Sequence, residues 1–184
     1  YLSGNKNEKA AFISSFRAEK KEVCGNLINA QGRVERSMRS INLQDWEEAL
    51  QIGQPVLYLH IPGGAPLRKE DCLESIKTAY EFFPKYFPEF DYKAIISSSW
   101  LFDYSLSEFM PASNIAAFQS LFHLFPKAGA TDWQTRERVF ADPDLPMEKV
   151  PQKSSLQKIV KQHILAGGFW HSGGAFLMAK ELVK

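Results

Sequence analysis

The chain has 184 residues, of which 45% are hydrophobic, and its formal net charge is +1. This length suits one well-packed domain, and the near balance of charge excludes the strongly basic surface typical of nucleic-acid-binding proteins. No apolar run reaches the ~18 residues that a membrane-spanning helix needs, and no signal peptide is recognisable. We therefore expect a cytoplasmic protein that acts on neither nucleic acid nor membranes.

The cysteines and the first residue give further information on metal binding and domain organisation. Cys24 and Cys72 lie far apart, and neither has a second cysteine or a histidine at metal-ligand spacing. This usage is typical of a reduced protein and predicts no metal site. The sequence opens at Tyr1 without an initiator methionine. We interpret residues 1–184 as a single domain, the C-terminal part of a longer chain, and we expect a partner domain on its N-terminal side.

The first third of the chain predicts a β-hairpin between two short helices. Residues 6–16 are polar at first and then apolar, which favours a helix. Residues 23–43 predict two strands around a turn at 29–32, because a glycine close after an asparagine supplies the positive φ that hairpin turns favour. Residues 43–53 predict a second helix, which ends at Gly53.

The middle of the chain alternates strand and helix. Residues 56–61 are almost continuously apolar, which predicts a strand buried on both faces. Apolar residues then follow helical spacing from Cys72 to Phe83, and Pro84 and Pro88 are expected to end that helix. Residues 92–102 predict the next strand.

The last third predicts two helices and two strands. Residues 113–125 and 154–168 are expected to be helical, and each segment opens with a serine that can cap it. Residues 131–140 and 169–179 predict strands, with a close backbone approach at Gly173 and its neighbouring glycine. The complete order predicts an α/β fold with a mixed, mostly antiparallel central sheet flanked by helices.

The turn Pro-Gly-Gly-Ala at residues 62–65 joins a predicted strand to a predicted helix. It is either a plain tight turn or a cradle for phosphate, because free N–H groups at a helix N-terminus attract anions. Bare glycine would let a phosphate oxygen approach the N–H groups of Gly64, Ala65 and Leu67. Arg68 follows, where it could meet the same charge or simply be solvated.

This order of elements is similar to the GNAT-like acyltransferase fold. The stretches LHIPGGAPL, SWLF, SNIAAFQ and PQKSSLQK resemble the GNAT-like C-terminal domain of bacterial acyltransferase-domain proteins, over residues 16–178. The resemblance implies acetyl-CoA or another acyl-CoA as co-substrate, with its pyrophosphate at Gly63, Gly64, Ala65, Leu67 and Arg68. It also implies that Asn114 opens the helix next to the cofactor and that a small-molecule or peptide amine accepts the acyl group.

The same resemblance suggests how the chemistry would run. The N–H near Ile61 would polarise the thioester carbonyl, and His60 would take the proton of the amine. The family's tyrosine that protonates the leaving thiolate is replaced here by Leu121. Asp103 and Tyr104 are the expected substitutes for that acid.

The sequence leaves other interpretations open. His60 could instead be a hydrogen-bonded structural histidine, which is the commoner role for a single histidine, and His171 could flank the same site or lie elsewhere. Three serines at 97–99 lack the Gly-x-Ser-x-Gly context of a hydrolase nucleophile. Typical members of the resembling fold carry an Arg/Gln-x-x-Gly-x-Gly/Ala loop, of which only Gly-Gly-Ala at residues 63–65 is present here. This incomplete loop and Leu121 favour an alternative function: a catalytically silent module that binds a ligand or partner and supports an N-terminal domain.

Overall fold

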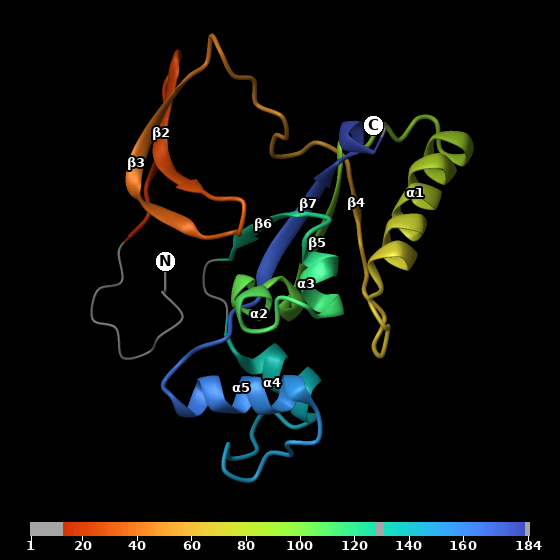
Figure 1. Ribbon diagram of the computed structural model, residues 1–184. Helices are drawn as coiled ribbons and strands as arrows, with labels where there is room; N and C mark the ends of the chain where they lie inside the picture. Colours follow the sequence, from red (N-terminus) through yellow and green to blue (C-terminus); the bar gives the residue numbers. More distant parts are fainter. Residues whose placement is uncertain (1–12, 128–130, 183–184) are drawn as a thin grey trace.

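Figure 1 shows the computed structural model, which describes residues 13–127 and 131–182. The described strands form two sheets. The first has the order β1-β2-β3 and comprises β1 (Phe16–Ala18), β2 (Glu22–Ile28) and β3 (Val34–Asn42). The second has the order β4-β5-β7-β6 and comprises β4 (Val56–Tyr58), β5 (Ala94–Ser99), β6 (His123–Pro126) and β7 (Gly173–Met178). Only β4 and β5 run parallel, so the predicted mixed and mostly antiparallel arrangement is confirmed.

Five α-helices accompany the described strands. They are α1 (Lys69–Tyr86), α2 (Tyr104–Phe109), α3 (Asn114–Gln119), α4 (Trp133–Phe140) and α5 (Ser155–Leu165). Short 3-10 turns follow β5 at Trp100–Phe102 and β7 at Ala179–Glu181. Within the described ranges, no helix is long and apolar enough to cross a bilayer.

Helices α1 and α3 pack on one face of the four-stranded sheet. Ile95 and Leu177 lie opposite each other on β5 and β7 and point to this face, as the period of two along a strand requires. The buried side chains here are Ile76, Tyr92, Ile95, Phe102, Phe118, Phe122, Leu124, Ala175 and Leu177. This cluster is the main core, and it fixes the ends of β4 and β5 where the candidate site lies.

A second, smaller core fills the segment between β6 and β7. Helices α4 and α5, the loop that joins them and the loop after α5 supply most of it, and α2, which precedes β6, packs against them (Figure 1). Its buried members are Leu106, Val139, Phe140, Met147, Val150, Val160 and Trp170. Although this insertion separates β6 from β7 in sequence, the two strands pair antiparallel, with His123 opposite Phe176.

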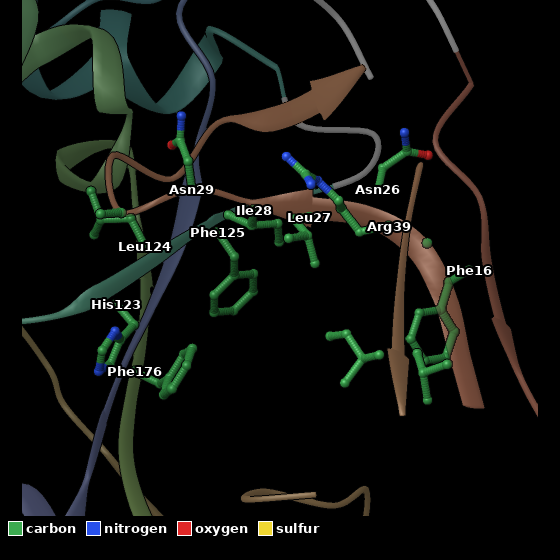
Figure 2. A pocket seen from close by; sticks show the side chains of 14 residues that line it. Phe16, Asn26, Leu27, Ile28, Asn29, Arg39, His123, Leu124, Phe125 and Phe176 are labelled. Carbon is green, nitrogen blue, oxygen red and sulfur yellow. The ribbon is translucent and has the colours of Figure 1, made fainter. Parts of the chain in front are cut away.

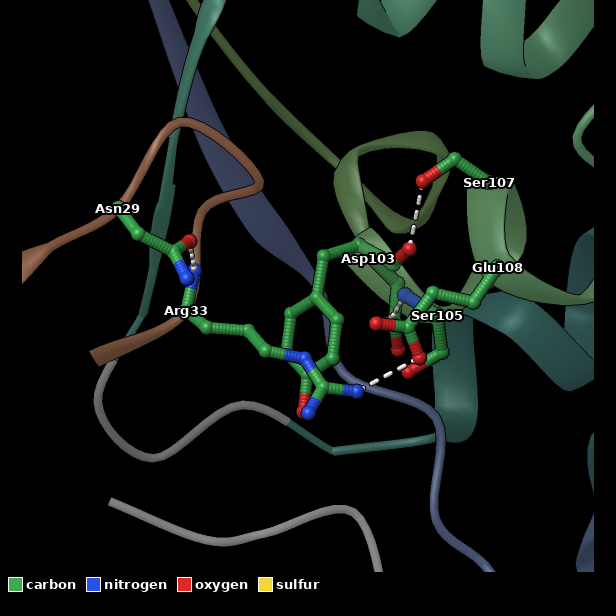
Figure 3. Close-up of polar contacts among 7 residues, drawn as sticks. Asn29, Arg33, Asp103, Ser105, Ser107 and Glu108 are labelled. Carbon is green, nitrogen blue, oxygen red and sulfur yellow. Dashed lines mark hydrogen bonds and ion pairs between the residues drawn. The ribbon is translucent and has the colours of Figure 1, made fainter. Parts of the chain in front are cut away.

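The predicted hairpin is confirmed, and its turn is fastened to the rest of the chain. Asn29 Oδ1 accepts hydrogen bonds from the N–H groups of Gln31 and Arg33 at 3.1 and 3.0 Å, which closes the turn. The Arg33 guanidinium then reaches Glu108 on α2 at 2.6 Å and lies 4.6 Å from the centre of the Tyr104 ring (Figure 3). The turn of the β2–β3 hairpin is therefore attached to α2, beside the four-stranded sheet. We call this hairpin the hairpin arch.

The close backbone approach predicted in the last strand is also found. A Cβ at Gly173 would run into the carbonyl of Phe102, and one at Gly174 would run into the ring of Phe125. Glycine at these two positions lets neighbouring segments touch β7 directly.

Two predicted elements are wrong. Residues 43–53 form turns and loop, with Trp46 66% exposed and Ile52 fully exposed. A helix of this length is marginal in water unless one face is packed, and these large side chains remain mostly exposed. Residues 133–140 are helix α4 and not a strand, because Thr135 and Val139 are buried at a spacing of four.

Other predictions had the right type of element but the wrong extent. Strand β4 ends at Tyr58 and lies at the sheet edge, so it is not buried on both faces: Tyr58 is 61% exposed. Helix α3 ends at Gln119, and the apolar run after it becomes β6. Helix α1 continues through Pro84 to Tyr86. The helix predicted at 6–16 falls largely outside the described residues, and its last residue, Phe16, belongs to β1.

Candidate functional site

Strands β4 and β5 separate at their carboxyl ends. Their pairing runs from Val56 to Tyr58, and the last ladder bond is donated by Leu59 N–H to the carbonyl of Ile96 at 2.8 Å. Beyond this point the Ser97 hydroxyl donates to the Leu59 carbonyl at 2.9 Å, so a side chain bridges the two strands. A parallel ladder that ends in this way leaves backbone groups of β4 free to face a ligand.

A cavity of about 620 Å³ opens at this split, and we call it the split cavity. Its walls come from the loop after β4, the end of β5, and helices α3, α4 and α5. The lining residues are Tyr58 to Leu67, Ser97 to Leu101, Asn114, Ile115, Gln134, Arg138 and Leu156. This lining includes His60 and Arg138 but no carboxylate side chain, which suits an anionic ligand.

The two glycines of the turn differ in backbone conformation. Ala65 N–H donates to the Pro62 carbonyl at 3.4 Å, and Gly64 has φ +77°, the left-handed conformation that glycine adopts without strain. Gly63 does not have a positive φ, and a Cβ built on it would meet nothing within 4 Å. Neither a positive φ nor close packing therefore requires glycine at 63.

Helix α1 begins without a side-chain cap. Arg68 is the N-cap residue, and its side chain pairs with Asp71 at 2.7 Å instead of capping the helix. Leu67, just before it, has φ +51°, which is uncommon for a residue with a side chain. The first turn also carries the carboxylates of Glu70 and Asp71, so Arg68 offsets part of a negative charge that would oppose a bound phosphate.

Asn114 connects helix α3 to the glycine loop. Its Nδ2 donates to the carbonyl of Pro66 at 2.9 Å, while the Ser113 hydroxyl caps α3 by accepting from Ala116 N–H at 3.1 Å. The predicted cofactor residues Ile61, Gly63, Gly64, Ala65, Leu67 and Asn114 therefore all border the split cavity. The lining does not include Arg68.

The predicted catalytic residues are not brought together. His60 is exposed and lines the split cavity. Asp103 is 2% exposed and lies outside that lining; its carboxylate accepts from Ser105 N–H at 2.8 Å and from His171 N–H at 2.6 Å. Burial raises the pKa of the Asp103 carboxyl, although these hydrogen bonds oppose the shift. Tyr104 is buried beneath Arg33.

Two polar side chains of helix α4 that line the split cavity were missed by sequence reasoning. Gln134 and Arg138 lie four residues apart on α4, a segment predicted as a strand. The Gln134 carbonyl accepts from Trp100 N–H at 2.9 Å and from the Ser172 hydroxyl at 3.2 Å, which fixes the end of β5 against α4. Their helical spacing was the signal that could have found them.

The remaining candidates lie away from the cavity. Leu121 packs against the main core, and His171 is half-buried beside Phe169. Both cysteines are free thiols. Among the described residues, no group of three or more His, Cys, Asp and Glu side chains is placed to hold a metal ion.

Comparison with known proteins gives one family. A family model described as GNAT-like C-terminal domain matches residues 12–177. Comparison with curated proteins finds no match.

Similar solved structures are complexes of an acyltransferase. One, with CoA and 10C-Teicoplanin, is 27% identical with a TM-score of 0.63, and the match covers 86% of this chain and 45% of that one. One with decanoyl-CoA has the same identity and TM-score, over 88% and 45%. A mutant with octanoyl-CoA is 25% identical with a TM-score of 0.60, over 86% and 45%. The chain thus spans about half the length of these proteins.

Proposed function

Because the chain belongs to the family of GNAT-like C-terminal domains, we propose that it binds an acyl-CoA in the split cavity and transfers the acyl group to an amine. The observation that carries this proposal is the parting of β4 from β5 beside a bare glycine turn. The similar acyltransferase structures, which hold CoA, decanoyl-CoA and octanoyl-CoA, support the choice of co-substrate.

The proposed reaction uses groups of the split cavity. The thioester lies between the separated strands, where the N–H of Ile61 has no acceptor among the described residues and can polarise the carbonyl. The amine nitrogen attacks the carbonyl carbon, the C–S bond breaks, and His60 takes the proton that the nitrogen loses. The CoA thiolate leaves and takes a proton from water.

A second candidate function is a catalytically silent module that only binds the ligand. It is favoured by the lack of an acid at the positions that the resemblance named: Leu121 packs against the core, and Asp103 and Tyr104 are not among the residues that line the cavity. A positioned acid is worth ~10²–10⁴-fold in rate, so its loss would slow transfer without abolishing it.

The broader organisation is also a proposal. We treat residues 1–184 as one domain with a partner domain on its N-terminal side, since the similar acyltransferases are about twice as long. A cytoplasmic location stays a prediction.

The test combines CoA binding with acyl transfer. Acetyl-CoA and octanoyl-CoA are mixed with a panel of amines, and free thiol is measured for wild type, His60→Asn and Tyr104→Phe. We expect His60→Asn to lower kcat by about 10²–10⁴-fold at unchanged CoA affinity, and Tyr104→Phe to have no effect. CoA binding without transfer to any amine would favour the silent module, and a failure to bind CoA would reject both candidates.

A further inference from the structure

One face of the four-stranded sheet is turned away from the main core. Leu57, Leu59 and Ile61 pack against the core, so alternation places Tyr58 and His60 on the opposite face. Tyr58 is paired with Ile96, Ile96 with Phe176, and Phe176 with His123, which makes one row of cross-strand neighbours across all four strands.

A second row lies beside the first on the same face. Ser98 is paired with Gly174, and Gly174 with Phe125. Ser98 and Tyr58 line the split cavity together with His60. Both rows start at the split cavity and end on β6. The first starts on β4 and crosses three strand spacings, or roughly 14 Å, and the second starts on β5 and crosses two, or roughly 10 Å.

Both rows end in another cavity of about 560 Å³, beneath the hairpin arch, which we call the hairpin cavity. Phe125 and Phe176 form its sheet side, and Leu27 and Ile28 form part of its hairpin side (Figure 2). Leu27 and Ile28 are 37% and 47% exposed. Its volume is in the range of small-molecule sites, and its walls are mostly apolar.

The hairpin cavity also carries one cation suited to an anionic ligand. Arg39 on β3 lines it, and in the described ranges the guanidinium has no ion pair. His123, the other basic residue of the lining, is already bonded to Glu181 at 2.9 Å. An apolar ligand that ends in a carboxylate would match this combination of surface and charge.

We infer that the acyl acceptor is an elongated amphiphile, with its amine at His60, its apolar body in the hairpin cavity and an anionic group at Arg39. This rests on the proposed function, because it assigns the acceptor to the face of the sheet that carries His60. The span of roughly 14 Å sets the distance between the amine and the apolar end. A short amine would reach only one of the two cavities.

The test is calorimetric binding of ω-aminododecanoate and ω-aminohexanoate to the protein, with and without saturating CoA. We expect the longer probe to bind about tenfold more tightly or better, since its extra methylenes are buried beneath the hairpin. Arg39→Met and Ile28→Ser should each remove most of that advantage. The matched controls Arg17→Met and Ile52→Ser change exposed residues outside both cavities and should leave it intact.

Three outcomes would overturn the inference: equal affinity for the two probes, no binding of either probe, or an advantage of the longer probe that survives both cavity variants. The failure of the proposed function is a separate result, namely that CoA itself does not bind. The probe comparison is then read on the CoA-free protein, where equal affinities still reject the elongated acceptor.

Discussion

The turn at residues 62–65 places two neighbouring glycines in different backbone conformations. Gly64 has φ +77°, so a side chain there is strained whatever the surrounding space. Gly63 has no such need, and the space beside it belongs to the split cavity. Substitutions at the two positions can therefore separate a structural role of the turn from a ligand-binding role.

We expect Gly64→Ala to lower the free energy of unfolding by about 1–2 kcal/mol, the cost of a left-handed conformation for a residue with a Cβ. Gly63→Ala should leave the free energy of unfolding unchanged and weaken CoA binding, because its methyl group occupies the approach to the N–H groups. Urea denaturation and calorimetric titration measure the two effects. If the Gly63→Ala variant binds CoA normally, the loop is only a structural turn and does not bind the cofactor.

His171 gives a prediction about pH. Its Nε2 is buried without a hydrogen-bond partner among the described residues, and burial, with the nearby His163, lowers the pKa of His171 below its ordinary 6.5, although Asp132 opposes the shift. Just below pH 6.5 the unfolded chain binds more protons at this residue than the folded chain does. Its contribution to stability is therefore complete above that pH and is lost as the pH falls towards the folded pKa.

The expected result is a steeper loss of stability on acidification in wild type than in His171→Gln. Denaturant midpoints at about pH 7.5 and about pH 5.5 measure it. Asp103 has the opposite effect on the pH dependence of stability, because its raised pKa makes the folded state bind the proton more tightly. Both proteins contain Asp103, so its effect cancels in the comparison. Equal slopes in the two proteins would show that the His171 ring is solvated.

At the scale of elements, the hairpin depends on how closely its turn approaches β6. Gly32 has φ +81°, and a Cβ built on it would lie 2.6 Å from the Cβ of Leu124. Gly53 has a similar φ of +91°, but a Cβ there would meet nothing within 4 Å. A Cβ at either position costs free energy because φ is positive, but only a Cβ at Gly32 would also clash with a neighbouring side chain.

We expect Gly32→Ala to destabilise the protein by clearly more than Gly53→Ala, which should cost about 1–2 kcal/mol. The excess reports the contact between hairpin and sheet, and hydrogen exchange in β2 and β3 should increase along with it. Urea denaturation of both variants gives the comparison. If the two substitutions cost the same, the turn does not pack on β6 and the hairpin cavity is open.

The elements that could be predicted are those with strong local signals. The hairpin turn, the serine at the start of α5 and the glycine turn each combine a special residue with a change of hydrophobic period. Helix α4 was mistaken for a strand because ten residues with apolar groups at several spacings fit either period. Residues 43–53 carry a helical pattern, but the side chains of Trp46 and Ile52 remain mostly exposed, so packing does not stabilise a helix there.

For the whole molecule, the sequence could locate the loop of the candidate site but not its surroundings. His60 and the glycine turn lie within six residues of one another, so a single sequence motif identifies both. Gln134, Arg138 and Leu156 reach the same cavity from an insertion more than thirty residues after β5, through packing of the second core. Asp103 and Tyr104 follow β5 after one 3-10 turn, Trp100–Phe102, and this turn places both residues in the interior.

The central claim is that acyl-CoA binds where β4 parts from β5. Hydrogen–deuterium exchange with and without saturating CoA tests it most directly, because it reads the amides that the claim names. We predict protection in residues 59–68 and 97–101, the two segments that border the split cavity, and no change in β2 or β3. Unchanged exchange in residues 59–68, or protection confined to the hairpin, would contradict the claim.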